Sequence, residues 1–499
     1  MHPQTQPELA AAARRATDVT LAAARLVGRV LGNVERLVVD TTRDALAVAR
    51  ESEALYRTAS EAAAGVAVAV RASPRFTRIL AEAARLAARY RLHQTHAAIV
   101  GAEAAEEALD ALHHSSAERL FALCVELRGG ILKLGQLAST RGDLLPSPYV
   151  RALSRLQDQV PAVPTELIRA HVEAALGQTI ANSFATFDDA PLAAASIAQV
   201  HAATLLDGRS VVVKVQVPGV AALVEADLAA LRVLSAAFRD VFPELDLETT
   251  ATELTRSVRE ELDYGQEARH VVAFQERLAA RSDVVVPGVH PELSTDTVLV
   301  LERIHGERLI DWLDRAEPAA RDPLLRTLLD VTCEQVLGHG LFHGDPHPGN
   351  FLVVDGADGP RLAILDFGSV RAWSPDVRRS YAELAMAILQ GDLDKMTTLF
   401  TRLGFEAKHG GDVSGLHELG ELVLSVFRQG TTMDLADLDP EAQLQFALSL
   451  ARRTPVRIPA DFVLLGRAFA ALGGLFMRYR PKLDLGAVLL PWLGRALTT

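Results

Sequence analysis

The chain has 499 residues, 49% of them hydrophobic and 23% charged, so it is long enough for two or three folded domains and is not disordered throughout. Its net charge of −12, from 51 basic and 63 acidic residues, argues against a general nucleic-acid binder. We find neither an uninterrupted apolar stretch of transmembrane length nor a signal-peptide pattern. We therefore expect a cytoplasmic protein, and a peripheral membrane contact stays open.

Cysteine and lysine are both rare in this chain. The two cysteines, Cys124 and Cys333, lie in apolar helical stretches, which predicts core thiols in a reducing compartment. Only five of the 51 basic residues are lysines: Lys133, Lys214, Lys395, Lys408 and Lys482. Because arginine supplies nearly every positive charge, a lysine indicates a position that needs a compact ammonium group on a flexible stem.

The first part of the chain has a helical pattern. Residues 1 to about 110 are rich in alanine, leucine, valine and arginine, and apolar side chains recur at helical spacing at Val27, Val30, Leu31, Val34, Leu37 and Val38. Such amphipathic helices pack on protein more often than they lie on a membrane surface. A second helical pattern covers residues 106–145 and contains RGGILKLGQLAST, and prolines at 146, 148, 161 and 164 then predict a linker.

The character of the sequence changes between residues 184 and 217. The segments FATF, QVHAATL and SVVVKVQV predict strands, with a turn at Asp207-Gly208. Helices are expected over 220–238 and 249–278, and further strands at DVVVPGV and TVLVLERI. After Gly306 the pattern is mainly helical, except for a hairpin of strands 351–354 and 362–367 around the turn 355–360. We therefore expect a ligand site between a small sheet-containing lobe and a larger helical lobe.

The strongest local signal is the segment FHGDPHPGN, followed by the hairpin and LDFGS. Four residues separate Asp345 from Asn350, and Asp366 opens Asp-Phe-Gly 21 residues after Asp345. A loop aspartate positions or deprotonates a hydroxyl group, while an amide oxygen and a second carboxylate together suit Mg²⁺. Because the hairpin returns the chain toward one point, we assign Asp345 to catalysis and Asn350 and Asp366 to metal binding.

Two histidines flank Asp345 and suggest a different kind of site. The pattern H-x-D-x-H, from His343 to His347, resembles a cluster of metal ligands. Pro346 and Pro348 indicate a rigid loop instead. We therefore expect both histidines to make hydrogen bonds that shape this loop rather than to hold zinc.

Lys214 lies near the end of an apolar strand, VVVKVQ, where a lysine binds nucleotide phosphates if a carboxylate holds it in place. The segment VREELDYGQEARH offers three candidate carboxylates. We favour Glu267 as the partner of Lys214 and Glu261 next, with Asp263 close to Glu261. The alternative for each is a solvated acidic face of a helix.

An alanine-rich segment occupies the place where nucleotide kinases usually have a glycine-rich phosphate loop. It contains Ala193, Ala194, Ala195 and Ser196. Because a Cβ atom restricts φ, this backbone approaches phosphates less freely than glycine would. The segment therefore predicts nucleotide binding with restrained or redirected phosphoryl transfer, although composition alone would make it an ordinary turn.

These segments together resemble the UbiB, or AarF-domain, family of atypical protein-kinase-like proteins. The resemblance covers roughly residues 106–371 and rests on five features in order: KLGQ (133–136), AAASIAQVH (193–201), VVVK (211–214), ELDYGQEA (261–268), and HGDPHPGN with LDFG. It implies an α+β, two-lobed protein-kinase-like fold with a mainly helical N-terminal extension. The expected parts are a helical region (1–110), the KLGQ-containing extension (111–165), an N-lobe (166–305), and a C-lobe with C-terminal helices (306–499).

The resemblance also implies roles for individual residues. Lys214 would contact phosphates with Glu267 as its ion-pair partner, and Asp345 would be the catalytic-loop aspartate, with Asn350 and Asp366 binding Mg²⁺. The remaining residues fall in three further motifs. A catalytic Lys133 and a cofactor-binding Gln136 would lie in an extension that folds over the site. Glu261 and Asp263, in an associated acidic motif, would also bind the cofactor, and Glu302 and Ile304 would lie in the hinge that receives adenine.

Membership would imply ATP binding, ATPase or phosphotransfer activity, and a link to isoprenoid quinone or lipid metabolism at membranes. Some members carry C-terminal membrane spans, and we predict no such span from this sequence. One alternative is a small-molecule phosphotransferase resembling aminoglycoside or choline kinases, which share the HGD-x-H-P-GN loop but do not need KLGQ or AAASIAQVH. Another is a nucleotide-binding scaffold without catalysis, against which the set Asp345, Asn350 and Asp366 argues.

Overall fold

The computed structural model describes residues 74–139, 145–158, 162–238, 247–344, 346–357, 359–407, 414–432, 456–457 and 459–498. These residues divide between two compact units. We call them the helical unit, which contains residues 74–162, 194–198 and 217–259, and the sheet unit, which contains residues 163–193, 199–216 and 260–498. The four-part division expected from the sequence stays a prediction.

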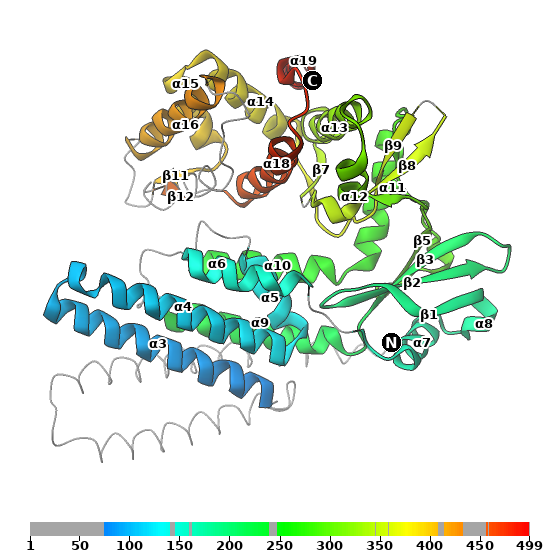
Figure 1. The fold of residues 1–499 in the computed structure, drawn as a ribbon, viewed down its shortest axis with the longest axis horizontal. Coiled ribbons are helices and arrows are strands. Elements are labelled where there is room, and N and C mark those ends of the chain that lie inside the picture. The colour runs from blue at the N-terminus through cyan, green and yellow to red at the C-terminus, as the bar shows by residue number, and fades with distance from the viewer. Residues whose placement is uncertain are drawn as a thin grey trace, which may run out of the picture. The chain divides into compact units, whose positions relative to one another are not determined.

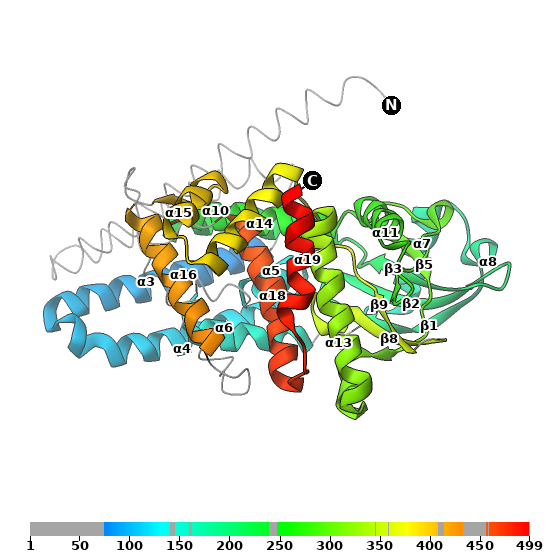
Figure 2. The same ribbon diagram turned by 90° about the horizontal axis from the view of Figure 1, so that it is seen from above.

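The helical unit is built around a pair of long helices. Helix α3 (Pro74–Val100) and helix α4 (Ala102–Leu127) lie side by side (Figures 1 and 2). They pack with α5 (Gly129–Ser139), α6 (Ser147–Ser154) and α9 (Val220–Phe238), and α10 (Leu247–Glu261) follows. The buried side of α3 has helical spacing, with Ile79, Ala83, Leu86, Ala87 and Tyr90 inside. The predicted helices that fall before Pro74, including the stripe Val27–Val38, lie outside the described residues.

The linker predicted after residue 145 is partly wrong, because α6 and a 3₁₀ turn (Arg155–Asp158) lie within it. Pro146 is the N-cap of α6, and Pro148 lies in its first turn. A proline is tolerated there because the first N–H groups of a helix have no partner within the helix. The two prolines therefore mark where the helix starts, and Tyr149, Ala152 and Leu153 are buried on it.

A four-stranded sheet forms the first part of the sheet unit. Its order is β1 (Phe184–Ala194), β2 (Ala198–Leu205), β3 (Ser210–Gln216) and β5 (Val298–Glu302), and β3 and β5 are antiparallel. Val211, Val213 and Val215 of β3 are fully buried against α7 (Thr165–Leu176) and α8 (Ile180–Ser183). Because side chains alternate along a strand, Lys214 lies on the opposite face.

The single helix predicted over 249–278 is in fact two helices. Helix α10 ends at Glu261, and α11 (Tyr264–Leu278) begins after Leu262 and Asp263. The Asp263 side chain accepts a hydrogen bond from the Gln266 N–H, which makes it the N-cap of α11. A short polar residue inside an acidic helical pattern thus starts a new helix.

The second part of the sheet unit contains the predicted hairpin. Strands β8 (Phe351–Gly356) and β9 (Gly359–Ile364) pair antiparallel, so the hairpin is confirmed, with a shorter turn than expected. They form a sheet in the order β4 (Val284–Val285), β9, β8, β6 (Glu307–Arg308). Helices α12 (Leu309–Arg315) and α13 (Pro318–Cys333) and a π-helical segment (Glu334–His339) lead to β7 (Leu341–His343), which pairs with β10 (Val370–Ala372).

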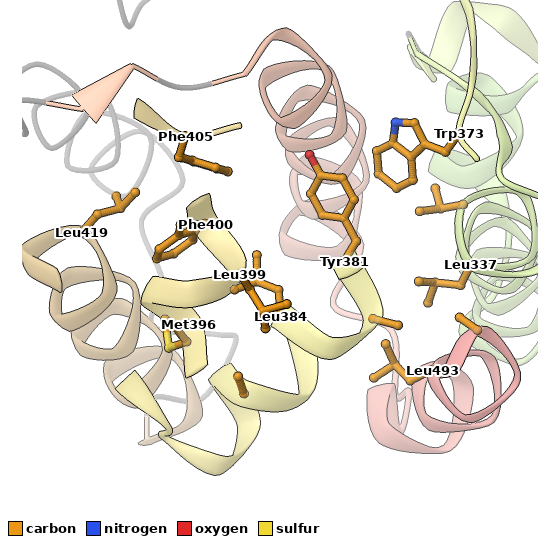
Figure 3. Close-up of a cluster of buried hydrophobic side chains, with 14 of the residues drawn as sticks. Leu337, Trp373, Tyr381, Leu384, Met396, Leu399, Phe400, Phe405, Leu419 and Leu493 are labelled. Atoms are coloured by element: carbon orange, nitrogen blue, oxygen red, sulfur yellow. The ribbon is translucent and has the colours of Figure 1, made fainter. Parts of the chain in front are cut away.

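Helices complete the sheet unit. They are α14 (Pro375–Gln390), α15 (Leu393–Arg402), α16 (Ser414–Thr432), α18 (Ala460–Tyr479) and α19 (Leu485–Thr498), and β11 (Glu406–Ala407) pairs with β12 (Val456–Arg457). Their shared core includes Trp373 stacked on Tyr381, with ring centroids 4.2 Å apart, and Phe400, Phe405 and Leu493 (Figure 3). Helix α19 packs on α13 (Figure 2).

Two expectations from composition can be compared with the fold. Cys124 and Cys333 are both buried, as core thiols should be, and burial raises the pKa of each to about 12. Within the described parts of the chain, we find no helix whose length and apolarity would suffice to cross a bilayer.

Candidate functional site

An ion pair between strand β3 and helix α11 is the centre of the candidate site. Lys214 Nζ lies 2.7 Å from Glu267 Oε1 and 2.8 Å from Glu267 Oε2. The same ammonium group lies 3.4 Å from Asp366 Oδ1. The sheet unit therefore brings together three residues that are 53 and 152 positions apart in the chain, and the ion pair forms with Glu267 rather than with Glu261.

The three charged side chains differ strongly in exposure. Glu267 is 2% exposed, Lys214 20% and Asp366 40%. Burial opposes the positive charge of Lys214, but the carboxylates of Asp366 and Glu267 outweigh it and hold the lysine pKa well above its ordinary value. Burial raises the pKa of Glu267 to about 7. Lys214 opposes this rise, and the nearby carboxylate of Asp366 adds to it. One cation thus faces two acids, and the more exposed acid is Asp366.

Helix α11 holds Glu267 in place from its first turn. Asp263 caps the helix, and Glu267 lies where a negative charge interacts favourably with the helix dipole. The Tyr264 ring lies under the lysine, with Nζ 5.2 Å from the ring centroid, a cation–π arrangement. Gln216, at the end of β3, donates to the carbonyl oxygens of Leu262 (2.6 Å) and Asp296 (3.0 Å). The bond to Leu262 therefore connects the end of β3 with the residues just before α11, beside the ion pair.

The β8–β9 hairpin brings Asn350 and Asp366 close to each other. Phe351 pairs with Ile364, and one step further the Leu365 N–H donates to the Asn350 carbonyl oxygen at 2.9 Å. Asp366 follows directly, and its Oδ1 accepts the Gly368 N–H at 3.1 Å. An amide oxygen and a carboxylate oxygen, which are ligands that Mg²⁺ prefers, are thus presented by adjacent backbone. Asp345 lies outside the described residues.

The two histidines of the HGDPHPGN segment make different contacts. His343 is buried on β7, and its backbone N–H donates to Gln335 Oε1 at 3.1 Å. His347 is exposed, and its Nδ1 accepts the Gly349 N–H at 3.1 Å, which caps the short turn of residues 348–350. His347 therefore makes the loop-shaping hydrogen bond expected of it. In the part of the chain that the structure describes, no three His, Cys, Asp or Glu side chains are arranged to hold a metal ion.

Two further predicted residues lie at the end of β5, and two in the acidic motif. Glu302 is the last residue of the strand. Its backbone N–H donates to the Gly288 carbonyl oxygen at 2.7 Å, and its Oε2 accepts the Gly288 N–H at 3.1 Å. Ile304 follows outside the strand. Glu261 lies beside Gly368, since a Cβ atom added to that glycine would come 3.7 Å from Glu261 Cγ. Asp263 acts as the helix cap described above.

The KLGQ motif lies on α5 of the helical unit. Gln136 donates from Nε2 to the Leu156 carbonyl oxygen (2.9 Å), and its Oε1 accepts from the Ser196 hydroxyl (3.3 Å). Gly135 packs so closely that an added Cβ would lie 2.7 Å from Leu156 Cδ1 and 2.9 Å from Cys124 Sγ. Lys133, on the same helix, is half-buried. The motif therefore joins its helix to the alanine-rich segment.

The alanine-rich segment forms the end of strand β1 and the turn that follows it. Ala193 and Ala194 are the last two residues of β1, and β2 begins at Ala198. The Ala195 N–H donates to the Ala198 carbonyl oxygen at 2.8 Å, and Ser196 is buried. The connection is therefore a tight turn that its own backbone hydrogen bond and Gln136 hold in place.

Sequence reasoning missed several residues that the structure makes prominent. Gln199 and His201 of the AAASIAQVH motif are buried. Gln199 Oε1 accepts the Val163 N–H, and His201 Nδ1 donates to the Asp188 carbonyl oxygen at 2.9 Å. His270, one turn after Glu267, lies 3.1 Å from the Phe367 carbonyl oxygen. Helical spacing from Glu267 was the one signal that could have pointed to His270.

Comparison with known proteins places these features in one family. The model of the ABC1 atypical kinase-like domain matches residues 155–400. Probable protein kinase UbiB of Marinobacter nauticus is 30% identical over 385 residues, which cover 76% of this chain and 70% of that protein. The chain belongs to the UbiB/AarF family of ABC1 atypical kinase-like proteins. The predicted α+β, two-lobed kinase-like fold with a helical N-terminal region is thereby confirmed.

Two more proteins are similar to this UbiB/AarF chain over much of its length. The protein ACTIVITY OF BC1 COMPLEX KINASE 8, chloroplastic, of Arabidopsis thaliana is 32% identical over 394 residues, or 72% of this chain, and the chain spans only 51% of it. The solved complex of Rv3197 with erythromycin from Mycobacterium tuberculosis is 26% identical, with a TM-score of 0.49, and the match covers 75% of this chain and 94% of that one.

Proposed function

We propose that this chain binds Mg-ATP and acts as an atypical kinase or ATPase of the UbiB type. The observation that carries the proposal is the Lys214–Glu267 ion pair with Asp366 3.4 Å from the same ammonium group. Phosphoryl transfer depends on positioning and charge stabilisation more than on covalent chemistry by the protein, and this cluster supplies both.

In this proposal each residue has a separate task. Lys214, held by Glu267, would bind phosphate oxygens as a point charge. Asn350 and Asp366 would hold Mg²⁺, which keeps few protein ligands and takes the rest from phosphates and water; the bound ion neutralises charge on the phosphates. Asp345 would orient the acceptor hydroxyl or water. The backbone at Glu302 and Ile304 would receive the adenine.

The remaining motif residues would limit access and turnover. Ala193, Ala194 and Ala195 carry Cβ atoms where closer backbone approach would need glycine, so we expect slow transfer. Gln136 holds Ser196 at 3.3 Å, and Lys133 lies on the same helix. Glu261 and Asp263 belong to the acidic segment that precedes Glu267. We propose that Gln136 restrains the phosphate-binding turn through Ser196, and that Asp263 supports Glu267 by capping its helix.

We further propose that the reaction supports isoprenoid quinone or lipid metabolism, with a peripheral membrane contact. The support is the family and the name of the Marinobacter relative, a probable protein kinase UbiB. Turnover of ATP should therefore rise when liposomes that contain a quinone-precursor mimic are added. Equal turnover with and without such liposomes would contradict this part while leaving the ATP proposal intact.

Calorimetric titration tests the core of the proposal. We expect purified protein to bind ATP in the presence of magnesium. Its affinity for ATP should fall about 100-fold when EDTA removes the magnesium or when Asp366 is changed to Asn. Asp394→Asn is a matched control, because Asp394 is exposed in the first turn of α15. Absence of magnesium-dependent uptake by the unaltered chain would refute the function.

A panel of small alcohols and aminoglycosides tests the second predicted function. An atypical kinase or ATPase of the UbiB type should not phosphorylate any of them stoichiometrically. Robust transfer to one member would favour the small-molecule phosphotransferase instead. Mg-ATP binding with equal, negligible turnover in the unaltered chain and in Asp366→Asn would favour a nucleotide-binding scaffold.

A further inference from the structure

Residues on successive turns of helix α11 contact the Asp-Phe-Gly segment from one face of the helix. Glu267, His270 and Phe274 are three and four positions apart, so they lie along the same side of the helix. His270 Nδ1 is 3.1 Å from the Phe367 carbonyl oxygen, and the rings of Phe274 and Phe367 meet edge to face at 5.1 Å. The segment is therefore held by its backbone and by its aromatic side chain.

The hydrogen bond from His270 acts on a particular peptide unit. A carbonyl oxygen only accepts, so His270 Nδ1 carries the hydrogen and donates it to Phe367. The same peptide unit contains the Gly368 N–H, which donates to Asp366 Oδ1 at 3.1 Å. Because a peptide unit is planar, fixing the direction of its C=O also fixes the direction of its N–H. His270 is thus linked to the Asp366 carboxylate through one rigid plane.

We propose that His270 is a positioning residue, which orients Asp366 for the cation by fixing the Phe367–Gly368 peptide plane. The inference rests on the proposed function, since it assigns Asp366 to magnesium. Glu267 reaches the same place by another route, because its Oε2 would lie 3.8 Å from a Cβ atom on Gly368. Helix α11 therefore supplies both the partner of Lys214 and the residue that sets the orientation of Asp366.

Two substitutions separate the hydrogen bond from the volume of the side chain. His270→Leu fills the space without a donor. His270→Asn places an amide nitrogen on Cγ, where Nδ1 is attached in histidine, so it restores the donor. Val272→Ala is the matched control, because Val272 is exposed on the same helix.

The first measurement is the magnesium dependence of ATP turnover. Loss of one orienting hydrogen bond should raise the magnesium concentration for half-maximal turnover about tenfold in His270→Leu. His270→Asn should return most of that shift, and Val272→Ala should match the unaltered chain. A purely structural role would lower the amount of folded protein without shifting the magnesium requirement. An unshifted requirement in folded His270→Leu, or equal shifts in Leu and Asn, would overturn the proposal.

The second measurement does not depend on activity. Amide hydrogen exchange at Gly368 should be slow in the unaltered chain and in His270→Asn and fast in His270→Leu. Equal exchange in all three would overturn the positioning role even if ATP binds. If the unaltered chain takes up no Mg-ATP, the proposed function fails and the exchange data alone decide the positioning role. Should His270→Leu not fold, His270→Ala, which suits a helix, takes its place in both measurements.

Discussion

Two clusters of buried charge, one in each unit, differ in how they use their hydrogen bonds. In the helical unit, Arg75 from α3 and Asp227 from α9 form a pair with two contacts of 2.7 and 2.6 Å. Arg75 also donates to the carbonyl oxygens of Leu127 and Arg128, and Asp227 accepts the Ile131 N–H at 2.7 Å. In the sheet unit, Lys214 lies between Glu267 and Asp366.

The two clusters differ in whether a charged group remains accessible to solvent. Asp227 is fully buried and Arg75 only 11% exposed, and their donors and acceptors join the end of α4 to the start of α5. Asp366, in contrast, is 40% exposed although it lies beside a buried ion pair. In the Arg75–Asp227 cluster the charges balance and the remaining hydrogen bonds go to main-chain groups, so the cluster holds helices together. In the Lys214 cluster one lysine faces two carboxylates, and the accessible Asp366 can bind a cation.

The largest effect should follow from breaking the helical cluster. Asp227→Ala leaves the Arg75 guanidinium with buried, unmatched charge and removes the acceptor at the start of α5. We expect a loss of about 3–5 kcal/mol in the free energy of unfolding, measured by chemical denaturation. The matched control is Glu126→Gln, whose exposed partner is Arg78, and it should change stability little. Equal losses in both variants would contradict the comparison.

The next effect should follow from breaking the sheet-unit cluster. Lys214→Met removes the ammonium group that lies between the carboxylates of Glu267 and Asp366, so phosphates would meet unscreened negative charge. We expect turnover of Mg-ATP to fall about 100- to 1,000-fold, measured at saturating nucleotide. Lys395→Met is the control, because Lys395 is exposed on α15. Turnover that falls in step with the folded fraction would show that Lys214 is structural, like Arg75.

The sequence predicted the sheet-unit cluster far better than the helical one. Lys214 is a rare lysine in an apolar strand, and Glu267 lies in an acidic segment, so local motifs and the family resemblance pointed to both. Arg75 and Asp227 are 152 positions apart, and no motif links them, because a pair that acts only through packing leaves no local pattern.

The misread elements have local physical causes. Pro146 and Pro148 suggested a linker because proline breaks helix interiors, yet both lie at the start of α6. Asp263 looked like one more acid of a continuous helix, although its side chain caps the next one. Helical spacing placed His270 on the same side of α11 as Glu267, but not the backbone oxygen that its side chain meets, so the sequence analysis did not single it out.

A smaller effect should separate packing from chemistry within the KLGQ motif. Gly135→Ala adds a Cβ that would lie 2.7 Å from Leu156 and 2.9 Å from Cys124, so we expect a loss of about 1–3 kcal/mol in stability. Gly466→Ala, in α18, meets no atom within 4 Å and should instead stabilise by about 0.5–1 kcal/mol. Thermal unfolding should give a lower melting temperature for Gly135→Ala and a higher one for Gly466→Ala than for the unaltered chain. A stable Gly135→Ala protein with reduced turnover would place this glycine in the chemistry.

The smallest effect should appear as a pH dependence in the helical unit. Glu82 of α3 is buried and accepts from Arg119 at 2.5 and 3.0 Å and from Arg85. The hydrogen bond from Arg119 lowers the Glu82 pKa below its ordinary value of 4.5, against the effect of burial. The contribution of Glu82 to stability is therefore complete above about pH 4.5 and is lost as the pH falls through the lowered pKa.

Glu82→Gln should therefore differ most from the unaltered chain near pH 7, and the gap in unfolding free energy should shrink as the pH falls below 4.5. Chemical denaturation at several pH values between 3 and 7 measures this gap, and the differences cancel the titration of other carboxylates. Glu118→Gln is the control, because Glu118 forms an exposed pair with Arg155 on the surface. A gap for Glu82→Gln that stays constant with pH would mean that Arg119 does not stabilise the ionised form of Glu82.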